Sequence, residues 1–220
     1  MTKLSNLNRR QFLGATATAS GLMILRPELV RGTAANSAVR LGFLGCGNRG
    51  TGVATAMIDN TNTRMVALAD LFQDQLEKAR TNWDGVARKK GYAGIDPKLM
   101  FQGSKAFQEI AHCQEVDAIL LSTPDYFHVE HLEAVVDAGK HVYCEKPAGV
   151  DVVSCKKFIE VGKRAEGKLS LVVGFNVRWA SQFSETIRRI QNGALGKIGA
   201  VAGFYHAPEL NYPDRGKVSP

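Results

Sequence analysis

Short apolar runs alternate with amphipathic stretches along most of the chain. The runs have the length of strands, and the stretches between them carry apolar residues at helical spacing. Because two parallel strands need a crossover connection, usually a helix, this order predicts an α/β fold with a Rossmann-like doubly wound parallel sheet. Strands are predicted near residues 39–44, 64–70, 99–102, 117–122, 141–144 and 169–174, and helices near 49–59, 72–90, 104–112, 127–138 and 151–165.

Two of the predicted strands, 117–122 and 169–174, are apolar on both faces. Strands of this kind belong in the middle of a sheet that helices cover on both sides. The alternation therefore predicts a central position for both.

The pattern changes after residue 177. Residues 181–192 predict an amphipathic helix and residues 198–206 predict a strand, after which no periodicity remains. We therefore expect a Rossmann domain over 36–177 and the beginning of an incomplete α+β second domain over 178–220.

The motif Gly-Cys-Gly-Asn-Arg-Gly connects the first predicted strand to the first predicted helix. In a dinucleotide site one such glycine permits the tight turn, one lets the backbone approach the pyrophosphate, and one lets helix and strand pack closely. The helix N-terminus then offers free N–H donors to phosphate. For the arginine, both a contact with the pyrophosphate and a solvent-facing side chain stay open. The candidate residues are Gly45, Gly47, Asn48, Arg49 and Gly50.

Asp70 ends the second predicted strand. A carboxylate at this position accepts hydrogen bonds from the adenosine ribose hydroxyls and repels a 2′-phosphate. The sequence therefore favours NAD over NADP as the cofactor, with NADP left open. The alternative role for Asp70 is the N-cap of the helix that begins near Leu71.

The chain has 220 residues, of which 45% are hydrophobic, and a formal net charge of +7. This composition is sufficient for a full core. Residues 1–35 carry +4 of the charge, which leaves +3 for the rest. The basic character is therefore mostly a property of the first residues, and we expect no nucleic-acid partner.

Residues 8–14 form a twin-arginine pattern, which the mildly apolar stretch 15–25 follows. This stretch of eleven residues is too short to span a bilayer of about 30 Å as a helix, so we expect no permanent membrane span. We expect residues 1–35 to be a signal peptide that engages the twin-arginine export machinery, and a bacterial protein that is periplasmic or otherwise exported. The alternative is a frayed N-terminal helix.

The four cysteines show neither C-x-x-C nor zinc-finger spacing, and the histidines show no recognisable spacing. We expect small buried thiols, with a disulfide in an oxidising compartment as the alternative, and no metal site. The cysteines are Cys46, Cys113, Cys144 and Cys155.

Two further motifs follow predicted strands, Thr-Pro-Asp-Tyr-Phe-His at 123–128 and Cys-Glu-Lys-Pro at 144–147. The carboxyl ends of the strands of a doubly wound sheet open onto the ligand crevice, so both motifs should converge beside the cofactor. Together with residues 45–50 they resemble the glucose-fructose oxidoreductase, inositol dehydrogenase and rhizopine-catabolism (Gfo/Idh/MocA) family. The resemblance covers roughly residues 38–206 and includes Gly-Phe-Asn-Val-Arg-Trp at 174–179.

The resemblance implies that Lys146 contacts the substrate, while Glu145 and Pro147 shape the nicotinamide pocket. A lysine there can stabilise charge that develops on the reacting oxygen, and burial would lower its pKa towards a useful range. The alternative is a surface lysine in an ion pair with Glu145 or another neighbour.

The resemblance also places His128 at the nicotinamide end of the cleft, although a first-turn histidine bonded to the backbone is the alternative. Thr123 and Pro124 would contact the dinucleotide, because a proline at this position holds the backbone extended beside the cofactor. Asn176 and Arg178 would lie where the chain crosses between the domains.

The chain departs from the family pattern where the acid–base chemistry lies. The family's usual pair, an aspartate followed four residues later by a histidine, would fall near or past residue 220, and no such pair follows Lys146. We therefore expect a C-terminally truncated chain. A homo-oligomer would require a complete second domain.

These features predict an exported NAD(P)-dependent oxidoreductase, or the N-terminal part of one. It would transfer hydride between a bound nicotinamide nucleotide and a sugar or polyol. Two alternatives stay open, a non-catalytic dinucleotide-binding fragment and an NAD-dependent glycoside hydrolase.

Overall fold

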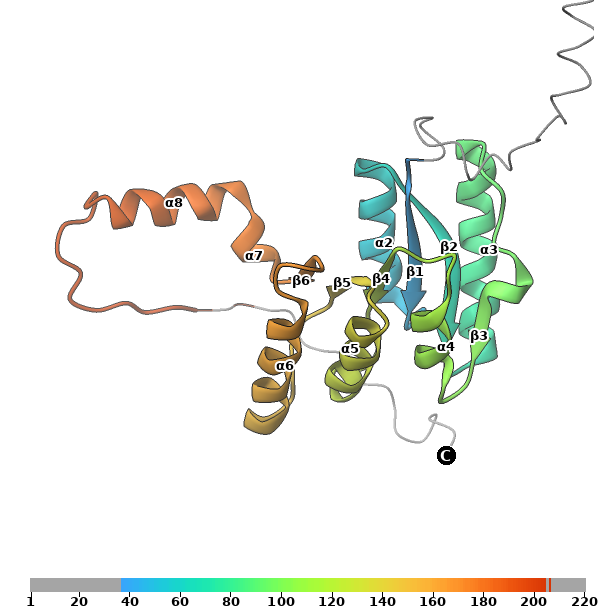
Figure 1. Ribbon diagram of the computed structural model, residues 1–220. Helices are drawn as coiled ribbons and strands as arrows, with labels where there is room; N and C mark the ends of the chain where they lie inside the picture. The colour runs from blue at the N-terminus through green and yellow to red at the C-terminus, as the bar shows by residue number, and fades with distance from the viewer. Residues whose placement is uncertain (1–36, 205, 207–220) are drawn as a thin grey trace, which may run out of the picture. The chain divides into compact units, whose positions relative to one another are not determined.

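The computed structural model describes residues 37–204 and residue 206 (Figure 1). The predicted signal over 1–35 lies outside these residues. The chain divides into two compact units at Gly174 and Phe175.

The first unit contains a sheet of six strands, all parallel, in the order β3-β2-β1-β4-β5-β6. The strand order reverses between β1 and β4, which gives the sheet two halves on either side of a topological switch point. The doubly wound fold predicted from the sequence is therefore confirmed. The strands are β1 (Val39–Leu44), β2 (Thr63–Asp70), β3 (Met100–Gln102), β4 (Ala118–Leu121), β5 (His141–Cys144) and β6 (Leu171–Val173).

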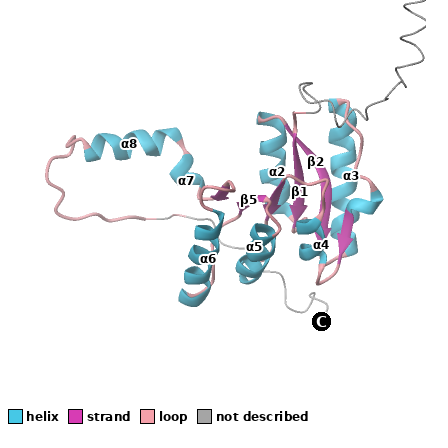
Figure 2. Cartoon of the chain, in the orientation of Figure 1, coloured by secondary structure: helices cyan, strands magenta, loops and turns pink. Residues whose placement is uncertain are grey.

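Helices cover both faces of this sheet (Figure 2). One core cluster joins Phe43 of β1 to Trp83 of α3, whose rings meet edge to face at 6.4 Å between centroids. The other joins Leu121 of β4 to Leu132 of α5 and Phe158 of α6. The helices are α2 (Asn48–Asn60), α3 (Gln73–Lys90), α4 (Ala106–His112), α5 (His128–Asp137) and α6 (Val152–Ala165), and two 3-10 turns are η2 (Pro97–Leu99) and η3 (Asp125–Phe127).

The two strands that are apolar on both faces differ in position. β4 lies between β1 and β5, as predicted, but β6 is one of the two edge strands among the described residues, and its residues Leu171–Val173 are only half-buried. The prediction of a central position was therefore wrong for the run 169–174. Apolar residues on both faces show that helices cover a strand, whereas backbone pairing decides how many strands flank it.

The second unit contains α7 (Asn176–Trp179) and α8 (Ser181–Gln191). The predicted helix near 181–192 is confirmed. Residues 198–204 and 206 adopt no regular secondary structure, so the strand predicted over 198–206 was wrong for the residues that are described. An extended segment becomes a strand only when another segment pairs with it, and no described segment does so here.

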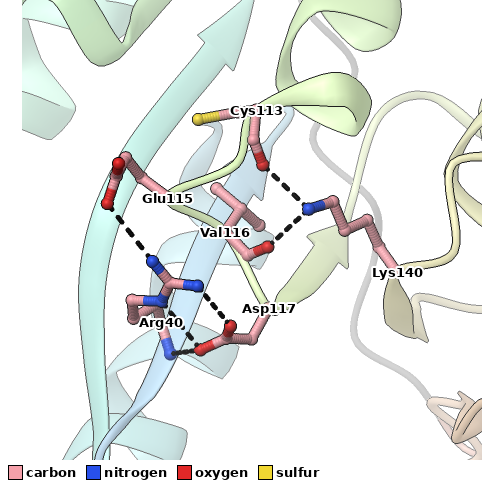
Figure 3. A network of polar contacts seen from close by, with 6 residues as sticks. All are labelled: Arg40, Cys113, Glu115, Val116, Asp117 and Lys140. Carbon is pink, nitrogen blue, oxygen red and sulfur yellow. Dashed lines mark hydrogen bonds and ion pairs between the residues drawn. The ribbon is translucent and has the colours of Figure 1, made fainter. Parts of the chain in front are cut away.

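A polar network fixes the amino ends of β1, β4 and β5 (Figure 3). The Arg40 guanidinium donates to both carboxylate oxygens of Asp117, at 2.7 and 3.1 Å, and also to Glu115 at 3.2 Å. The Lys140 Nζ donates to the backbone oxygens of Cys113 and Val116 at 2.8 and 2.7 Å. These contacts lie at the opposite end of the strands from the carboxyl ends, so they support the fold without occupying the ligand crevice.

Among the described residues, no helix combines the length and the apolar character that a membrane crossing needs.

Candidate functional site

The carboxyl ends of four neighbouring strands bring the predicted site residues together. Leu44 of β1 pairs in register with Ala69 of β2 and with Leu121 of β4, which in turn pairs with Cys144 of β5. The residues that follow this row are Gly45, Asp70, Ser122 and Glu145. Strand register therefore places residues up to 100 positions apart along one edge of the sheet.

Two adjoining cavities of about 360 and 410 Å³ open along this edge. We call them together the strand-end groove. The smaller cavity extends towards Phe107 and His131, and the larger one towards Glu145 and Lys146. Both are lined by Gly45, Asp70, Phe72, Thr123 and Pro124.

Gly45 makes the turn between β1 and α2. Its φ of +86° lies in the left-handed region that favours glycine. Its N–H donates to the Ala69 oxygen at 2.9 Å, and a Cβ at this position would lie 2.6 Å from the backbone nitrogen of Thr123. Both the turn and the close approach of two chain segments therefore require glycine.

Gly50 and Gly47 have opposite surroundings. A Cβ on Gly50 would overlap the Ser122 hydroxyl and the Phe43 ring, so this glycine lets α2 pack closely on the sheet. A Cβ on Gly47 would meet nothing within 4 Å. The backbone at Gly47 thus faces open space, as a backbone that approaches a ligand must.

The N-terminus of α2 is open to an anion. Its N-cap residue is Gly47, which has no side chain that could accept from the first-turn N–H groups, and the first turn of the helix carries no acidic residue. The positive end of the helix dipole therefore lies at the larger cavity, which Gly47 and Arg49 line.

The Asp70 carboxylate supports the glycine turn. One oxygen accepts from the Cys46 N–H at 2.7 Å and the other accepts from the Phe72 N–H at 3.0 Å. The N-cap residue of α3 is Phe72, so the alternative in which Asp70 caps this helix was wrong. Because Asp70 also lines both cavities, its carboxylate stands where a ribose would pass.

Arg49 and Glu145 form an ion pair across the groove. The Arg49 Nη2 lies 3.0 Å from Glu145 Oε1, and the two side chains are 54% and 4% exposed, respectively. The other carboxylate oxygen, Oε2, is buried and has no hydrogen-bond partner among the described residues. The sequence left open a contact of Arg49 with the pyrophosphate or a solvent-facing side chain, and neither alternative includes an ion pair with Glu145.

Lys146 and Pro147 follow Glu145 at the wall of the larger cavity. Lys146 is exposed within the first unit, so the burial considered for it is not found there. The ion pair considered between Lys146 and Glu145 is also not found there, since Glu145 pairs with Arg49 instead. Lys146 therefore presents a hydrated ammonium group at the end of the groove.

His128 is buried and ties two loops together. Its Nδ1 lies 2.7 Å from the Pro147 oxygen and its Nε2 lies 2.7 Å from the Thr123 oxygen. A neutral imidazole has one N–H and can satisfy one of these oxygens, whereas the doubly protonated ring satisfies both. The backbone-bonded alternative thus describes His128, which lines the larger cavity while it holds the loops after β4 and β5.

His131 is a site residue that the sequence did not reveal. Its ring stacks on Phe107 and Phe127, and its Nδ1 lies 3.0 Å from the Thr123 hydroxyl. Burial, together with the charge of His128, lowers the pKa of His131 to about 4. A neutral aromatic wall therefore lines the smaller cavity, where a flat apolar ring would fit. Its position one helical turn after His128 was the available signal.

Ser122 is the second residue that the sequence missed. Its hydroxyl donates to the Gly45 oxygen at 2.8 Å and so links the carboxyl ends of β1 and β4.

The remaining candidates from the sequence are Asn48, Asn176 and Arg178. Asn48 accepts a long hydrogen bond of 3.5 Å from Lys78. Asn176 and Arg178 belong to α7 in the second unit, and their role at the cofactor stays a prediction.

The four cysteines form no disulfide. Cys46 and Cys144 are buried, as expected, and burial raises the pKa of both thiols, with the charge of Asp70 or Glu145 adding to the effect. Cys113 is half-buried. Cys155 is exposed on α6, so the expectation of a buried thiol was wrong there.

The described residues fit a dinucleotide along the strand-end groove. Gly47 and the open N-terminus of α2 leave room and N–H donors for a pyrophosphate at the switch point between β1 and β4. Asp70 stands on the β2 side with the aromatic wall beyond it, and Glu145 stands on the β5 side. The two cavities thus match the two nucleotide halves.

Comparison with known proteins gives relatives that agree with this fit. Inositol 2-dehydrogenase of Rhizobium meliloti (strain 1021) is 29% identical over 163 residues, which are 74% of this chain and 44% of that protein. Glycosyl hydrolase family 109 protein 2 of Phocaeicola vulgatus is 24% identical over 167 residues, 76% of this chain and 38% of that protein. The chain therefore spans less than half the length of these curated relatives.

Among solved structures, scyllo-inositol dehydrogenase from Lactobacillus casei with bound NAD(H) and scyllo-inositol has a TM-score of 0.57 to this chain. It is 22% identical, and the likeness covers 72% of this chain and 42% of that one, so it shows the fold. The family described as "Oxidoreductase family, NAD-binding Rossmann fold" matches residues 39–175. Because this match covers more than half of the chain, the protein belongs to the Gfo/Idh/MocA oxidoreductase family, and residues 39–175 form its NAD-binding Rossmann fold.

Proposed function

We propose that this chain supplies the nicotinamide-nucleotide half of a dehydrogenase that acts on a hydroxyl group of a sugar or polyol. The observation that carries the proposal is the strand-end groove, which joins the glycine turn and Asp70 to the Glu145–Lys146–Pro147 segment. The relationship to inositol 2-dehydrogenase supports a cyclitol or similar polyol as the substrate class.

The cofactor would be held mainly by backbone and by one carboxylate. The N–H groups at the start of α2 would bind the pyrophosphate above Gly47, and Asp70 would accept from the adenosine ribose hydroxyls. Since a 2′-phosphate beside Asp70 would meet a negative charge, the groove favours NAD over NADP.

When bound, NAD supplies the hydride acceptor for alcohol oxidation, or the donor in its reduced form. Lys146 would donate a hydrogen bond to the reacting oxygen and stabilise the negative charge that develops there. Its exposed ammonium can reach a substrate that arrives from solvent. No Asp-x-x-x-His pair follows Lys146 in this sequence, so the proposal assigns no residue as the proton acceptor.

We further propose that residues 1–35 direct export by the twin-arginine route after the cofactor has bound. The support is the Arg9-Arg10 pattern and the apolar stretch behind it. Fractionation of cells that express the chain, with and without Arg9→Lys and Arg10→Lys, tests this. Export that persists in the double variant would contradict the proposal.

The test of the activity is NADH formation, followed by absorbance, when the protein is mixed with NAD⁺ and a panel of cyclitols and sugars. Lys146→Met should lower the rate by about a hundredfold or more while NAD⁺ affinity changes less than about twofold. Lys156→Met, which removes an exposed lysine on α6 outside the groove lining, should leave both unchanged. NAD⁺ binding without turnover of any substrate would favour the non-catalytic binding fragment instead.

A second candidate is glycoside hydrolysis with NAD as a cofactor. The observation that favours it is the similarity to glycosyl hydrolase family 109 protein 2. Release of nitrophenol from aryl glycosides by the NAD-loaded protein, without net NADH formation, would establish this activity over the dehydrogenase.

A further inference from the structure

Glu145 is a buried carboxylate in the wall of a solvent-open groove. It lines the larger cavity, yet its side chain is almost fully removed from solvent. Water therefore screens its charge poorly compared with that of a surface carboxylate.

The counter-charge of Glu145 is incomplete. Arg49 donates to Oε1 at 3.0 Å, and within the described part of the chain Oε2 has no hydrogen-bond partner. The Arg49 side chain is more than half exposed, so its positive charge is screened by water more strongly than the carboxylate. The field inside the groove near Glu145 is therefore negative.

Among the other charged groups that line this cavity, Lys146 opposes this negative field, whereas the carboxylates of Asp70 and Asp125 add to it. Asp125 and Lys146 are exposed, and Asp70 accepts two backbone N–H groups. His128 is buried, and both its ring nitrogens face backbone carbonyl oxygens. The partial negative charges of these oxygens offset the positive charge that a protonated ring would carry. Glu145 is thus the buried carboxylate of the groove.

The topology places Glu145 on the nicotinamide half of the groove. Asp70 ends β2, on one side of the switch point between β1 and β4, and Glu145 follows β5 on the other side. A dinucleotide lies across the switch point with one nucleotide on each half. With the adenosine ribose at Asp70, the nicotinamide lies on the side of Glu145.

We propose that Glu145 makes this site bind NAD⁺ more tightly than NADH. The nicotinamide ring carries a positive charge in NAD⁺ and none in NADH, so a buried carboxylate nearby favours the oxidised form. The inference rests on the proposed function. By thermodynamic linkage, the bound cofactor then has a lower reduction potential than the free cofactor, and retained NADH gives up its hydride more readily.

The test measures dissociation constants for NAD⁺ and NADH by calorimetry on the whole chain. The wild type should bind NAD⁺ about tenfold more tightly than NADH, and Glu145→Gln, which removes the charge but keeps the shape, should bring the two within about twofold. Glu133→Gln is the matched control, because Glu133 pairs with Lys157 and Arg164 outside the groove lining. It should keep the wild-type ratio.

The outcomes separate a charge effect from a structural one. Equal weakening of NAD⁺ and NADH by Glu145→Gln would mean that Glu145 acts only as a hydrogen-bond acceptor or a packing group, and would overturn the inference. Equal or tighter binding of NADH by the wild type would also overturn it. If Glu145→Gln does not fold, the double variant R49Q/E145Q removes both partners, and the same loss of preference is expected. If the wild type binds neither form, the proposed function fails, and this inference with it.

Discussion

Alanine at Gly50 should destabilise the first unit, whereas alanine at Gly52, in the same helix, should stabilise it. A Cβ on Gly50 would overlap the Ser122 hydroxyl and the Phe43 ring, whose Cζ would lie 2.8 Å away. Phe43 is fully buried against Trp83, so its ring cannot move without disturbing the core. A Cβ on Gly52 would meet nothing within 4 Å.

The two effects have opposite signs and can be estimated. Overpacking of a core costs about 1–3 kcal/mol, and a disturbed Ser122 hydrogen bond adds about 1 kcal/mol. Alanine regains up to about 1 kcal/mol over glycine in a helix, which is the full effect expected at Gly52. Because the helix gain is common to both variants, they should differ by about 2–4 kcal/mol in free energy of unfolding, or roughly 4–16 °C in Tm for a domain of this size.

Thermal unfolding followed by circular dichroism, on wild type and both variants in one buffer, measures this difference. We expect Gly50→Ala to melt below the wild type and Gly52→Ala at or above it. If Gly50→Ala melts as high as Gly52→Ala, α2 does not pack on β1 as closely as described, and the role assigned to the third glycine of the motif is wrong.

Two further predictions concern charge and thiols. Burial raises the pKa of Asp117, but hydrogen bonds and charge from Arg40 outweigh it, so the pKa lies below its ordinary value. Such a carboxyl stabilises the fold above its unfolded pKa of about 3.9 and loses this contribution as pH falls through the lower folded value. Asp117→Asn should thus lower the free energy of unfolding by about 1 kcal/mol at neutral pH. Denaturant titrations should show that this difference between wild type and variant disappears as the pH falls below about 4. A difference that stays the same at all pH values would contradict this prediction. A thiol reagent at about pH 8 should modify the exposed Cys155 in the folded protein but spare Cys144. Burial, together with the charge of Glu145, raises the pKa of Cys144 to about 12. Rapid modification of Cys144 would refute its burial.

Local patterns in the sequence predicted most elements of the first unit. The strand expected at 39–44 is β1 with the same bounds, and the helices expected near 72–90 and 151–165 are α3 and α6 within a residue. These elements carry strong periodicity, and clear signals mark some of their ends, such as Gly91 after α3 and the capping box at Asp151.

Features that depend on distant partners could not be predicted in the same way. The edge position of β6 and the absence of a strand at the described residues 198–204 and 206 both depend on backbone pairing, which leaves no trace in a segment's own residues. The Arg49–Glu145 pair joins residues 96 positions apart, and it arises because strand register aligns the ends of β1, β4 and β5. The motif showed which residues were candidates, but the contacts among them came from the topology.

The most direct test of the central claim, that the strand-end groove binds NAD, is a calorimetric titration of NAD⁺ into wild type, Gly47→Val and Gly52→Ala. Gly47 has an extended backbone and open space above it, so valine should cost only a few degrees of Tm while its side chain fills the room expected for the pyrophosphate. We predict that wild type and Gly52→Ala bind NAD⁺ alike and that Gly47→Val binds at least about tenfold more weakly, a loss of about 1.4 kcal/mol. Wild-type affinity in a folded Gly47→Val variant, or no binding by the wild type, would contradict the claim.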